Sequence, residues 1–533
     1  MGIVDHIWLG IQSVVFGPAL FSILGLHVPT SIAMVVLGLF TGIMVGATPG
    51  LAGPTAMAVA LPILISIFGV TPDALLPVFA FLIGIMKGAT IGGAVPAILF
   101  NTPGTPDALL TTYDGHPMTK AGLSGKALRV AHVSSVSGDT VSDIVLFVCA
   151  PFLAIVVEAY LDFPEKTALI ILSLAFMAAV IGRSVARGLI SASLGMLAAF
   201  IATGEDFYPR LTFGISDLAE GFPIATAVLG VLIVGEIFKA IEDMANEKRL
   251  SGVIHRVKMT GDNRLRFSEY RRLLPYIGNS AAIGTAIGAL PGVGSTLAAT
   301  LGYASGKRMH ARARTNDEPA FGEGAPQGVA STEAANSAVS GANLIPVLSL
   351  GIPGNAAAVF LILATDSIGG FNPGPAVFKL PSNGINSEMV VAFGIFTLMA
   401  VANVFNWTVG GVIMRSMSVM IRIPKQYLLP VVLLVTLTAI YIQETNLAAI
   451  WFTIGFGVLG YLMRKLDMSV LPFVIAFILA GNLESTARSA FSASGGDPWF
   501  LFKSPIAVSF LLLAIFTIAG FARANTNNRR VPL

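Results

Sequence analysis

Long apolar runs recur along the whole sequence and constrain the fold more than any other feature. Of the 533 residues, 55% are hydrophobic and only 11% are charged, against about 25% charged in an ordinary soluble domain. A helix that crosses a membrane needs about 20 mostly apolar residues. Such runs lie at residues 31–45, 75–98, 144–160, 167–182, 190–201, 224–241, 390–414, 427–442, 447–463, 470–480 and 506–522. The sequence therefore predicts an all-α polytopic membrane protein with about 12 transmembrane helices.

The polar residues exclude several functional classes. The net charge is only +3, and the basic residues lie in loops, as is usual for cytoplasmic loops of membrane proteins, so we expect no nucleic-acid binding. Walker A, metal-ligand histidine and Gly-x-Ser-x-Gly patterns are all lacking, so we expect no enzyme and no cofactor. The single Cys149 rules out an internal disulfide. The first residues lack the positive region of a cleaved signal peptide, so we expect them to remain as an interfacial or first helix.

A basic segment near the middle divides the chain. Residues 246–274 are the longest polar interruption, and by the positive-inside rule this segment is a cytoplasmic linker. We therefore expect a first transmembrane repeat at residues 1–245 and a second at residues 275–533, with Pro-Gly motifs in each.

Two motifs recur in the same order in both halves. The stretch "GATPGLAGPT" at residues 46–55 matches "GALPGVGST" at residues 288–296, 242 positions later. A proline followed after six residues by Pro-Gly occurs at 96–104 and again, 250 positions later, at 346–354. This order and spacing indicate an internal duplication.

The motifs interrupt apolar segments that would otherwise be continuous helices. Paired Gly/Pro-interrupted segments in duplicated halves point to the midplane site of a secondary transporter, and broken backbone is tolerated at membrane depth only under protein or beside a watery cavity. Between its basic flanks, the segment around Pro291 and Gly292 is too long for one span and too short for two. A re-entrant hairpin and a single discontinuous span both fit it.

Small, hydroxyl and amide residues at the breaks are the candidate binding residues. Helix N-termini attract carboxylates, and exposed carbonyls at C-termini suit Na⁺. The alternative is that Gly and Pro only pack and kink the helices. The candidate substrate-binding residues at the breaks are Gly50, Gly53, Thr55, Asn101, Thr102, Gly104, Thr105, Gly292, Gly294, Ser295, Thr296, Gly354 and Asn355. The possible Na⁺ ligands among them are Thr55, Asn101, Ser295, Thr296 and Asn355.

Ionisable residues inside apolar stretches are further candidates, because charge at membrane depth is costly. Lys87 could face an anionic substrate or pair with an acid, or it could extend to the membrane surface. Asp139 and Asp143, one helical turn apart, could bind a cation, relay a proton or cap a helix. Glu333 and Asn336 lie on one face of a polar, small-residue stretch and complete the predicted substrate site.

Several motifs together resemble the large membrane subunit of the tripartite tricarboxylate transporters, the TctA family. They are "GATPGLAGPTAMAVALP", "GGAVPAILFNTPGTPDALLTTYDGHPMTKAGLSGKALRVA", "GALPGVGST", "GVASTEAANSAVSGANLIPVLSLGIPGNAAAVFL" and "FNPGPAVF". The resemblance runs from about residue 20 to residue 500. It places the family's Pro-Gly motifs at Pro49-Gly50 and Pro291-Gly292, its Asn-x-Pro-Gly motif at residues 101–104 and its Glu-Ala-Ala-Asn motif at residues 333–336. Lys87 departs from the family pattern, where we expect an aromatic residue, and this favours a substrate whose charge pattern differs from that of citrate.

The resemblance implies a multi-pass protein of the bacterial cell inner membrane that imports a carboxylate. It also implies a small four-helix membrane subunit of the TctB type, a periplasmic solute-binding protein of the TctC type, and Na⁺ or H⁺ as the coupling ion. With two inverted repeats and hairpins, we expect an elevator-like motion. A passive anion channel and a membrane sensor that binds without translocating are the alternatives.

Overall fold

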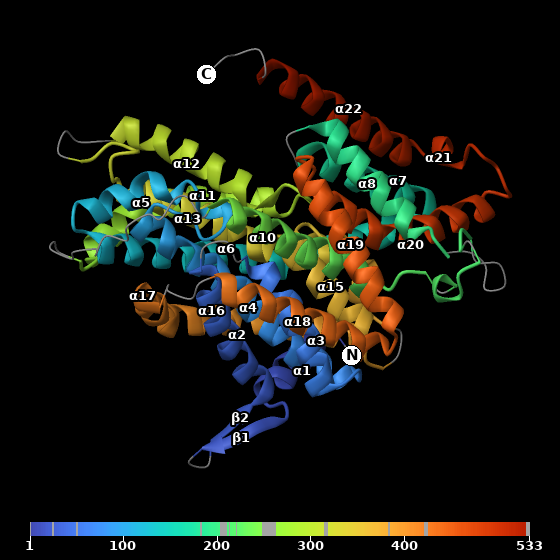
Figure 1. The fold of residues 1–533 in the computed structure, drawn as a ribbon, viewed down its shortest axis with the longest axis horizontal. Coiled ribbons are helices and arrows are strands. Elements are labelled where there is room, and N and C mark those ends of the chain that lie inside the picture. Colours follow the sequence, from blue (N-terminus) through green and yellow to red (C-terminus); the bar gives the residue numbers. More distant parts are fainter. Residues whose placement is uncertain are drawn as a thin grey trace. The chain divides into compact units, whose positions relative to one another are not determined.

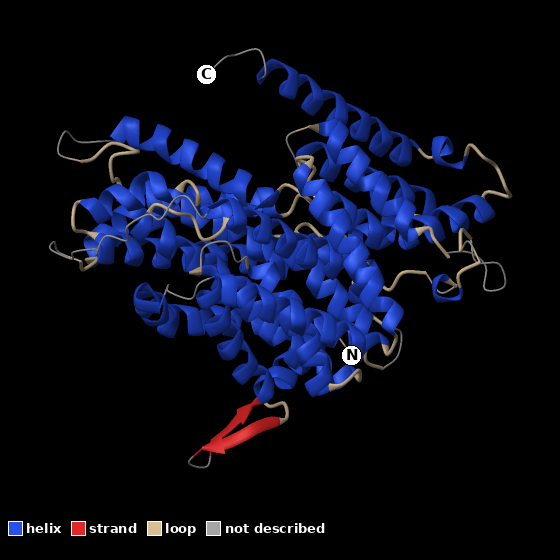
Figure 2. Cartoon of the chain, viewed as in Figure 1, coloured by secondary structure: helices blue, strands red, loops and turns tan. Residues whose placement is uncertain are grey.

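The computed structural model is almost entirely helical over the residues that it describes. These are 2–23, 26–48, 52–181, 184–202, 210–212, 214–219, 221–247, 263–313, 318–381, 384–420 and 425–528. Two short strands, β1 (Ala19–Ile23) and β2 (Leu26–Pro29), form an antiparallel hairpin with Phe21 opposite Val28 (Figure 2). The predicted all-α class is confirmed.

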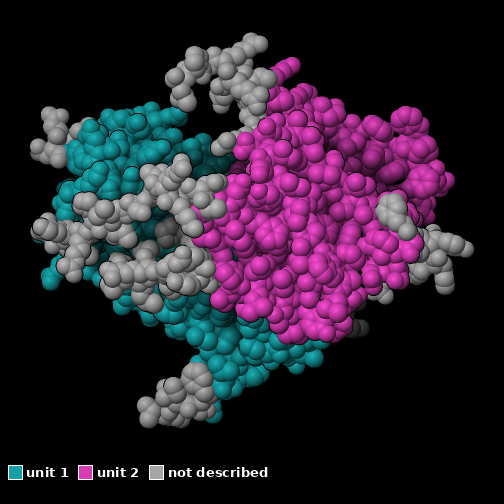
Figure 3. Space-filling view, in the orientation of Figure 1, with its two compact units in different colours: residues 1–155, 252–290, 294–427 teal, residues 156–251, 291–293, 428–533 magenta. Residues whose placement is uncertain are grey.

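The chain divides into two compact units, coloured separately in Figure 3. Unit 1 comprises residues 1–155, 252–290 and 294–427, and unit 2 comprises residues 156–251, 291–293 and 428–533. Each unit takes helices from both sequence halves. The division into repeats at 1–245 and 275–533 describes the sequence and stays a prediction.

Unit 1 holds the helices that carry most of the predicted site residues (Figure 1). Its α-helices are α1 (Ile3–Val15), α2 (Thr30–Gly46), α3 (Gly53–Phe68), α4 (Leu75–Phe100), α5 (Thr111–Lys120), most of α6 (Ser124–Tyr160), α11 (Phe267–Gly288), α12 (Gly294–Ala313), α13 (Pro326–Ala342), α14 (Leu344–Leu350), α15 (Ala356–Ile368), α16 (Ser387–Phe405) and α17 (Gly411–Met420). Short 3₁₀ helices lie at η1 (Pro72–Ala74), η2 (Pro106–Ala108) and η5 (Pro375–Phe378), and a π-helical turn, η6 (Asn406–Gly410), joins α16 to α17.

Unit 2 is built from the remaining helices. They are α7 (Phe163–Val180), α8 (Val185–Ala199), η3 (Ser216–Leu218), α9 (Ile224–Leu229), the π-helical turn η4 (Gly230–Val234), α10 (Gly235–Glu247), most of α18 (Lys425–Glu444), α19 (Leu447–Lys465), α20 (Leu471–Ala493), α21 (Phe500–Lys503) and α22 (Pro505–Asn528). Within this unit α7 packs against α8, α20 and α22, and α19 packs against α9 and α10.

Seven helical segments of the described chain are long and apolar enough to cross a membrane. They are Pro72–Phe100, Ser124–Tyr160, Phe163–Val180, Ile224–Met244, Ser387–Met417, Leu447–Lys465 and Pro505–Arg523. Further apolar helices, such as α2 and α3, have 10 to 17 residues. The multi-pass membrane class is therefore supported, and the figure of about 12 spans stays a prediction.

A seam of small residues joins α2 to α4. Glycines recur every fourth residue at positions 38, 42 and 46 of α2 and at 84, 88 and 92 of α4. A Cβ added at Gly42 would lie 2.5 Å from the carbonyl oxygen of Ile85, and one added at Gly88 would lie 2.4 Å from that of Leu39. The two backbones are therefore in direct contact, as in small-xxx-small pairs of membrane helices.

The second half repeats this seam between α11 and α13. At the spacings of the two duplicated motifs, the α2 glycines correspond to Ser280, Gly284 and Gly288, and the α4 glycines correspond to Ala334, Ala338 and Ala342. A Cβ added at Gly284 would lie 2.3 Å from the carbonyl oxygen of Ala335. Each half thus contains a helix, a break, a second helix and a returning helix that packs on the first.

The two Pro-x6-Pro-Gly motifs also end their helices in the same way. Asn101 and Gly351 both adopt the left-handed conformation, with φ of 55° and 70°. The next amide in each case donates back to the proline carbonyl that opens the motif, Thr102 to Pro96 at 3.3 Å and Ile352 to Pro346 at 3.2 Å. These bonds reach one residue further than the six-to-one bond of a Schellman motif, and both helices end in this same way.

The segment around Pro291 and Gly292 is a turn between two packed helices. Asn279 on α11 donates a hydrogen bond to Ser305 on α12 at 2.8 Å. These residues lie equally far from Gly292, so α11 and α12 run side by side in opposite directions. The segment is therefore a helix-turn-helix, and the re-entrant hairpin and the single discontinuous span both stay predictions.

Candidate functional site

Helix α13 forms a buried polar interior in unit 1. Every residue from Gln327 to Ala342 is buried, although the helix is rich in hydroxyl and amide side chains. Its buried polar residues include Ser331, Thr332, Glu333, Asn336, Ser337 and Ser340. Polar and ionisable groups in the interior of a membrane protein are costly, and they mark substrate or ion pathways.

Glu333 is the ionisable residue of this helix and is fully enclosed. Its carboxylate accepts hydrogen bonds from the Thr111 hydroxyl at 2.5 Å and from the Ser135 hydroxyl at 3.0 Å. All three residues have 0% exposed surface. Helices α5, α6 and α13 therefore meet at one buried carboxylate.

Other buried polar atoms around α13 have no hydrogen-bond partner within the described residues. On α13 they are the hydroxyls of Ser331 and Ser337, the side-chain nitrogen of Asn336 and the side-chain oxygen of Gln327. Other helices and loops of unit 1 add the hydroxyls of Ser134, Ser280, Thr285 and Thr105. An unsatisfied buried donor or acceptor costs about 1–3 kcal/mol. A set of this size is therefore suited to bonding a polar solute or ion.

The turn at Pro103-Gly104 and the short helix η2 that follows it contact two other predicted motifs. A Cβ added at Gly104 would lie 2.3 Å from the carbonyl oxygen of Gly46, where α2 ends at the first break. Asp107, in η2, accepts a hydrogen bond from the Thr296 hydroxyl at the start of α12, at 2.5 Å. The structure thus brings residues from three of the four predicted motifs together in unit 1.

The fourth motif begins α15. The Asn355 side chain accepts a hydrogen bond from the amide of Ala358 at 2.9 Å and so caps the helix. Gly354, just before it, is buried. Helix α15 packs against α3 and α4, and α3 begins at Gly53. The helices that follow the first and fourth motifs are therefore neighbours.

The remaining predicted residues are scattered. Gly50 lies outside the described residues. Thr55, Gly294 and Ser295 are half-buried at the first turns of α3 and α12, Thr105 is buried, and Asn101 and Thr102 are exposed. Gly292 has a φ of +83°, and a Cβ added to it would lie 2.4 Å from the Met177 side chain on α7. Both residues belong to unit 2. Within the described chain no three His, Cys, Asp or Glu side chains gather as a metal site.

Lys87 is buried and paired, so the prediction that its side chain extends to the membrane surface is wrong. It has 0% exposed surface in the middle of α4, and its ammonium lies 2.8 Å from Asp143 and 3.5 Å from Asp139. Helix capping by the two aspartates is also wrong, because both lie far inside the 37-residue α6. The expected pairing of Lys87 with an acid is confirmed, and the structure identifies the acids as Asp143 and Asp139.

Asp114 is an important residue that the sequence analysis missed. Its carboxylate on α5 accepts bonds from the amides of Gly322, Gly324 and Ala325, at 2.8–3.0 Å, and from the Tyr303 hydroxyl at 2.9 Å. Burial raises the pKa of Asp114 above its ordinary value, and the four donors oppose that rise. The carboxylate fixes the loop that leads into α13. No local pattern signals it, because its partners lie about 200 residues away.

We expect Asp114→Ala to destabilise the entry to α13. The change leaves three buried or partly buried amides without an acceptor, and we expect a loss of about 3 kcal/mol or more. The midpoint of thermal unfolding of the purified chain measures it, with Asp73→Ala, at an exposed acidic residue of η1, as the matched control. Equal midpoints for the two variants would contradict the assigned role.

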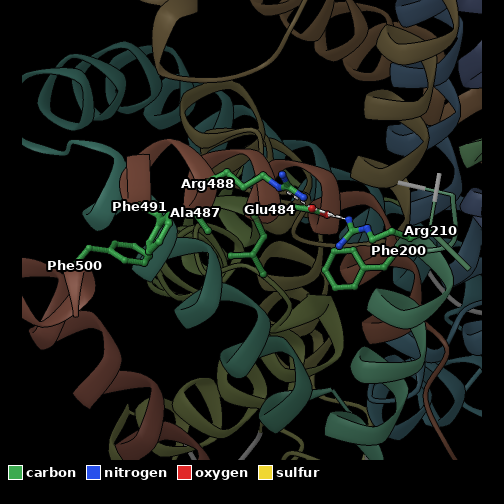
Figure 4. Close-up of a pocket in the computed structure, with 8 residues that line it drawn as sticks. Phe200, Arg210, Glu484, Ala487, Arg488, Phe491 and Phe500 are labelled. Atoms are coloured by element: carbon green, nitrogen blue, oxygen red, sulfur yellow. Dashed lines mark hydrogen bonds and ion pairs between the residues drawn. The ribbon is translucent and has the colours of Figure 1, made fainter. Parts of the chain in front are cut away.

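Unit 2 contains an open groove lined by charged and aromatic side chains (Figure 4). Glu484 lies between Arg210 and Arg488, at 2.6 Å and 2.9 Å, and the rings of Phe200, Phe491 and Phe500 line the groove. The ion pairs engage all three charged groups. None of the predicted binding residues lines it.

Comparison with known proteins decides the family. The family model described as "Tripartite tricarboxylate transporter TctA family" matches residues 32–475. The chain belongs to this family. An Agrobacterium vitis protein described as "Uncharacterized 52.8 kDa protein in TAR-I ttuC' 3'region" is 31% identical over 494 residues, which cover 91% of this chain and 92% of that protein. A second, "Uncharacterized protein in TAR-II ttuC' 3'region" from the same organism, is 29% identical over 235 residues, or 44% of this chain and 92% of that protein.

No solved structure matches the chain. Membership of the TctA family confirms the resemblance drawn from the Pro-Gly motifs. It makes the chain a membrane component of a transporter, which agrees with the seven apolar segments.

Proposed function

We propose that this TctA-family chain is the large transmembrane subunit of a binding-protein-dependent secondary transporter that imports a di- or tricarboxylate, or a related organic anion, together with a cation. The observation that carries the proposal is the buried polar interior around α13, where unpartnered hydroxyl and amide groups gather on a helix that contacts η2, the short helix bonded to Thr296 of the second Pro-Gly motif. Hydroxyls, amides and helix N-termini are groups that orient a carboxylate. A helix that served only for packing would not require buried hydroxyl and amide groups.

The candidate substrate residues divide into two groups in this proposal. Asn336 and the unpartnered hydroxyls of α13 bind the solute directly, and the residues of the breaks shape the backbone around it. For the coupling cation, the predicted Na⁺ ligands at residues 55, 101, 295, 296 and 355 remain one proposal, and proton coupling is the other. The Thr296 hydroxyl and the Asn355 carbonyl already serve Asp107 and the α15 cap, which weakens the Na⁺ site.

The remaining parts of the proposal follow from the family. The chain works in the bacterial inner membrane with a small TctB-like subunit and a periplasmic TctC-like binding protein that delivers the anion. Duplicated hairpins suit an elevator-type motion of one part of the chain against a fixed part.

Flux measurements test this function. The chain is reconstituted in proteoliposomes with a TctB-type subunit and a TctC-type binding protein, and uptake of radiolabelled citrate or succinate is measured with and without Na⁺ and pH gradients. We expect saturable uptake that requires the binding protein and a cation gradient. Linear, gradient-independent flux would indicate a channel, and binding without flux would indicate a sensor.

A further inference from the structure

Three ionisable side chains from two helices meet inside unit 1. The Lys87 ammonium donates to Asp143 at 2.8 Å and to the side-chain oxygen Oδ1 of Asn403, on α16, at 3.0 Å, and it lies 3.5 Å from Asp139. The Asn403 amide nitrogen also donates to Asp143, at 2.7 Å. Lys87 and Asp139 are fully buried, and the Asp143 side chain is 10% exposed. We call Lys87, Asp139 and Asp143 the charge cluster.

The charge cluster is unbalanced. Two carboxylates and one ammonium give a net charge of −1 when all three groups are ionised. Each uncompensated charge inside a protein costs several kcal/mol even after relaxation. The cluster can therefore remain buried at low cost only if it takes up one further positive charge.

Neighbouring helices supply no such charge within the described part of the chain. Helices α2 and α3 carry no ionisable residue, α13 carries only Glu333, which is bonded to Thr111 and Ser135, and α16 carries only Glu388 at its first turn. On α17, Arg415 donates to the Gly411 carbonyl, and on α6 the His132 ring contacts the Asn406 carbonyl. The missing charge must come from solution.

Asp139 is the group that can take up the missing positive charge. Among the described residues, neither of its carboxylate oxygens accepts a hydrogen bond and its ion pair with Lys87 is long, at 3.5 Å, whereas Asp143 has two donors on one oxygen. A metal cation would need several oxygen ligands and would lie beside the Lys87 ammonium, which repels it. A proton needs one oxygen and leaves the Lys87–Asp143 pair intact.

We propose that Asp139 is the proton-binding residue of this transporter and that the coupling ion is H⁺. The carboxylate gains a proton, forming one O–H bond, when the cluster is exposed to the side of uptake, and it loses that proton on the other side. Lys87 and Asn403 hold Asp143 ionised, so one proton is carried in each cycle. The inference rests on the proposed import function, and it deepens that function by naming the ion and its site.

Asp139→Asn is the central variant. It leaves one ammonium opposite one carboxylate, so we expect the protein to accumulate normally and to be at least as stable as the wild type. Lys87→Met leaves two buried carboxylates without a cation and is expected to prevent folding. Asp73→Asn, at an exposed acidic residue, is the matched control.

A first readout is independent of transport. In the purified full-length chain in lipid, infrared difference spectroscopy on changing pH follows the carbonyl stretch of protonated carboxyl groups. We expect a protonated band in the wild type and in Asp73→Asn that is lost in Asp139→Asn. A band unchanged in Asp139→Asn would overturn the assignment, whatever the transport assay shows.

The second readout is uptake of radiolabelled citrate or succinate by the reconstituted complex. A gradient of about two pH units supplies roughly 100-fold accumulation at one proton per anion. We expect the wild type to accumulate the anion under the pH gradient and not under a Na⁺ gradient. We expect Asp139→Asn to equilibrate the anion across the membrane without accumulating it.

Accumulation driven by Na⁺ alone, or undiminished proton-driven accumulation by Asp139→Asn, would overturn the inference while leaving the import function standing. Absence of flux from every preparation would instead refute the import function, and the infrared band would still decide the proton site.

Discussion

Replacing Gly42 by leucine is expected to abolish the folded state of unit 1. A Cβ at this position already lies 2.5 Å from the Ile85 carbonyl oxygen, and leucine adds three further carbons. Overpacking by single methylene groups costs about 1–3 kcal/mol, and a membrane or soluble domain is stable by only about 5–15 kcal/mol. Helices α2 and α4 would have to separate along their whole length. We expect no monodisperse protein by size-exclusion chromatography after membrane extraction.

Gly278→Leu is the matched control. Gly278 lies on the exposed side of α11, and a Cβ there meets nothing within 4 Å. This variant should accumulate like the wild type, because leucine also has the higher helix propensity. Normal recovery of Gly42→Leu would show that α2 and α4 are not held in direct backbone contact.

Glu333→Leu is expected to reduce uptake to below about one-tenth of the wild-type rate. The change removes the buried carboxylate of α13 and leaves the hydroxyls of Thr111 and Ser135 without an acceptor. Hydrogen bonds to charged groups contribute about 1.5–3 kcal/mol each, so stability should fall by several kcal/mol as well. Initial rates of citrate or succinate uptake and the thermal midpoint measure the two effects separately.

A triple variant separates the structural part of this effect from the functional part. Thr111→Val and Ser135→Ala, combined with Glu333→Leu, remove both donors together with the acceptor, and such paired removals are nearly neutral for stability. We expect the thermal midpoint to recover and uptake to remain low, with Glu323→Leu, at an exposed acidic residue, as the control. Recovery of uptake in the triple variant would make Glu333 a packing residue only.

The sequence allowed the backbone breaks to be predicted because their causes are local. Pro291 and Gly292 cannot continue a helix, and α11 and α12 meet at that point. The motif at residues 96–104 likewise ends α4, with Asn101 in a left-handed conformation. Glu333 was found because a carboxylate in a small-residue stretch is conspicuous without any knowledge of its neighbours.

The pairing of distant residues could not be predicted. Asp139 and Lys87 are on different helices, and their approach depends on how α6 lies against α4, which no local pattern specifies. Asp114 is hidden for the same reason, since its acceptor role depends on a loop about 200 residues later. The glycine seam is a different case. Its four-residue spacing is plain at positions 38, 42 and 46, and a search for small-xxx-small patterns would have found it.

The matching helix ends at Asn101 and Gly351 align the halves residue by residue, and this alignment sets Lys87 against Ser337. A chimaera made of two first halves would enclose two ammonium groups, and one made of two second halves would enclose none. The two halves are therefore not interchangeable at this position, because one has a buried ammonium where the other has a hydroxyl.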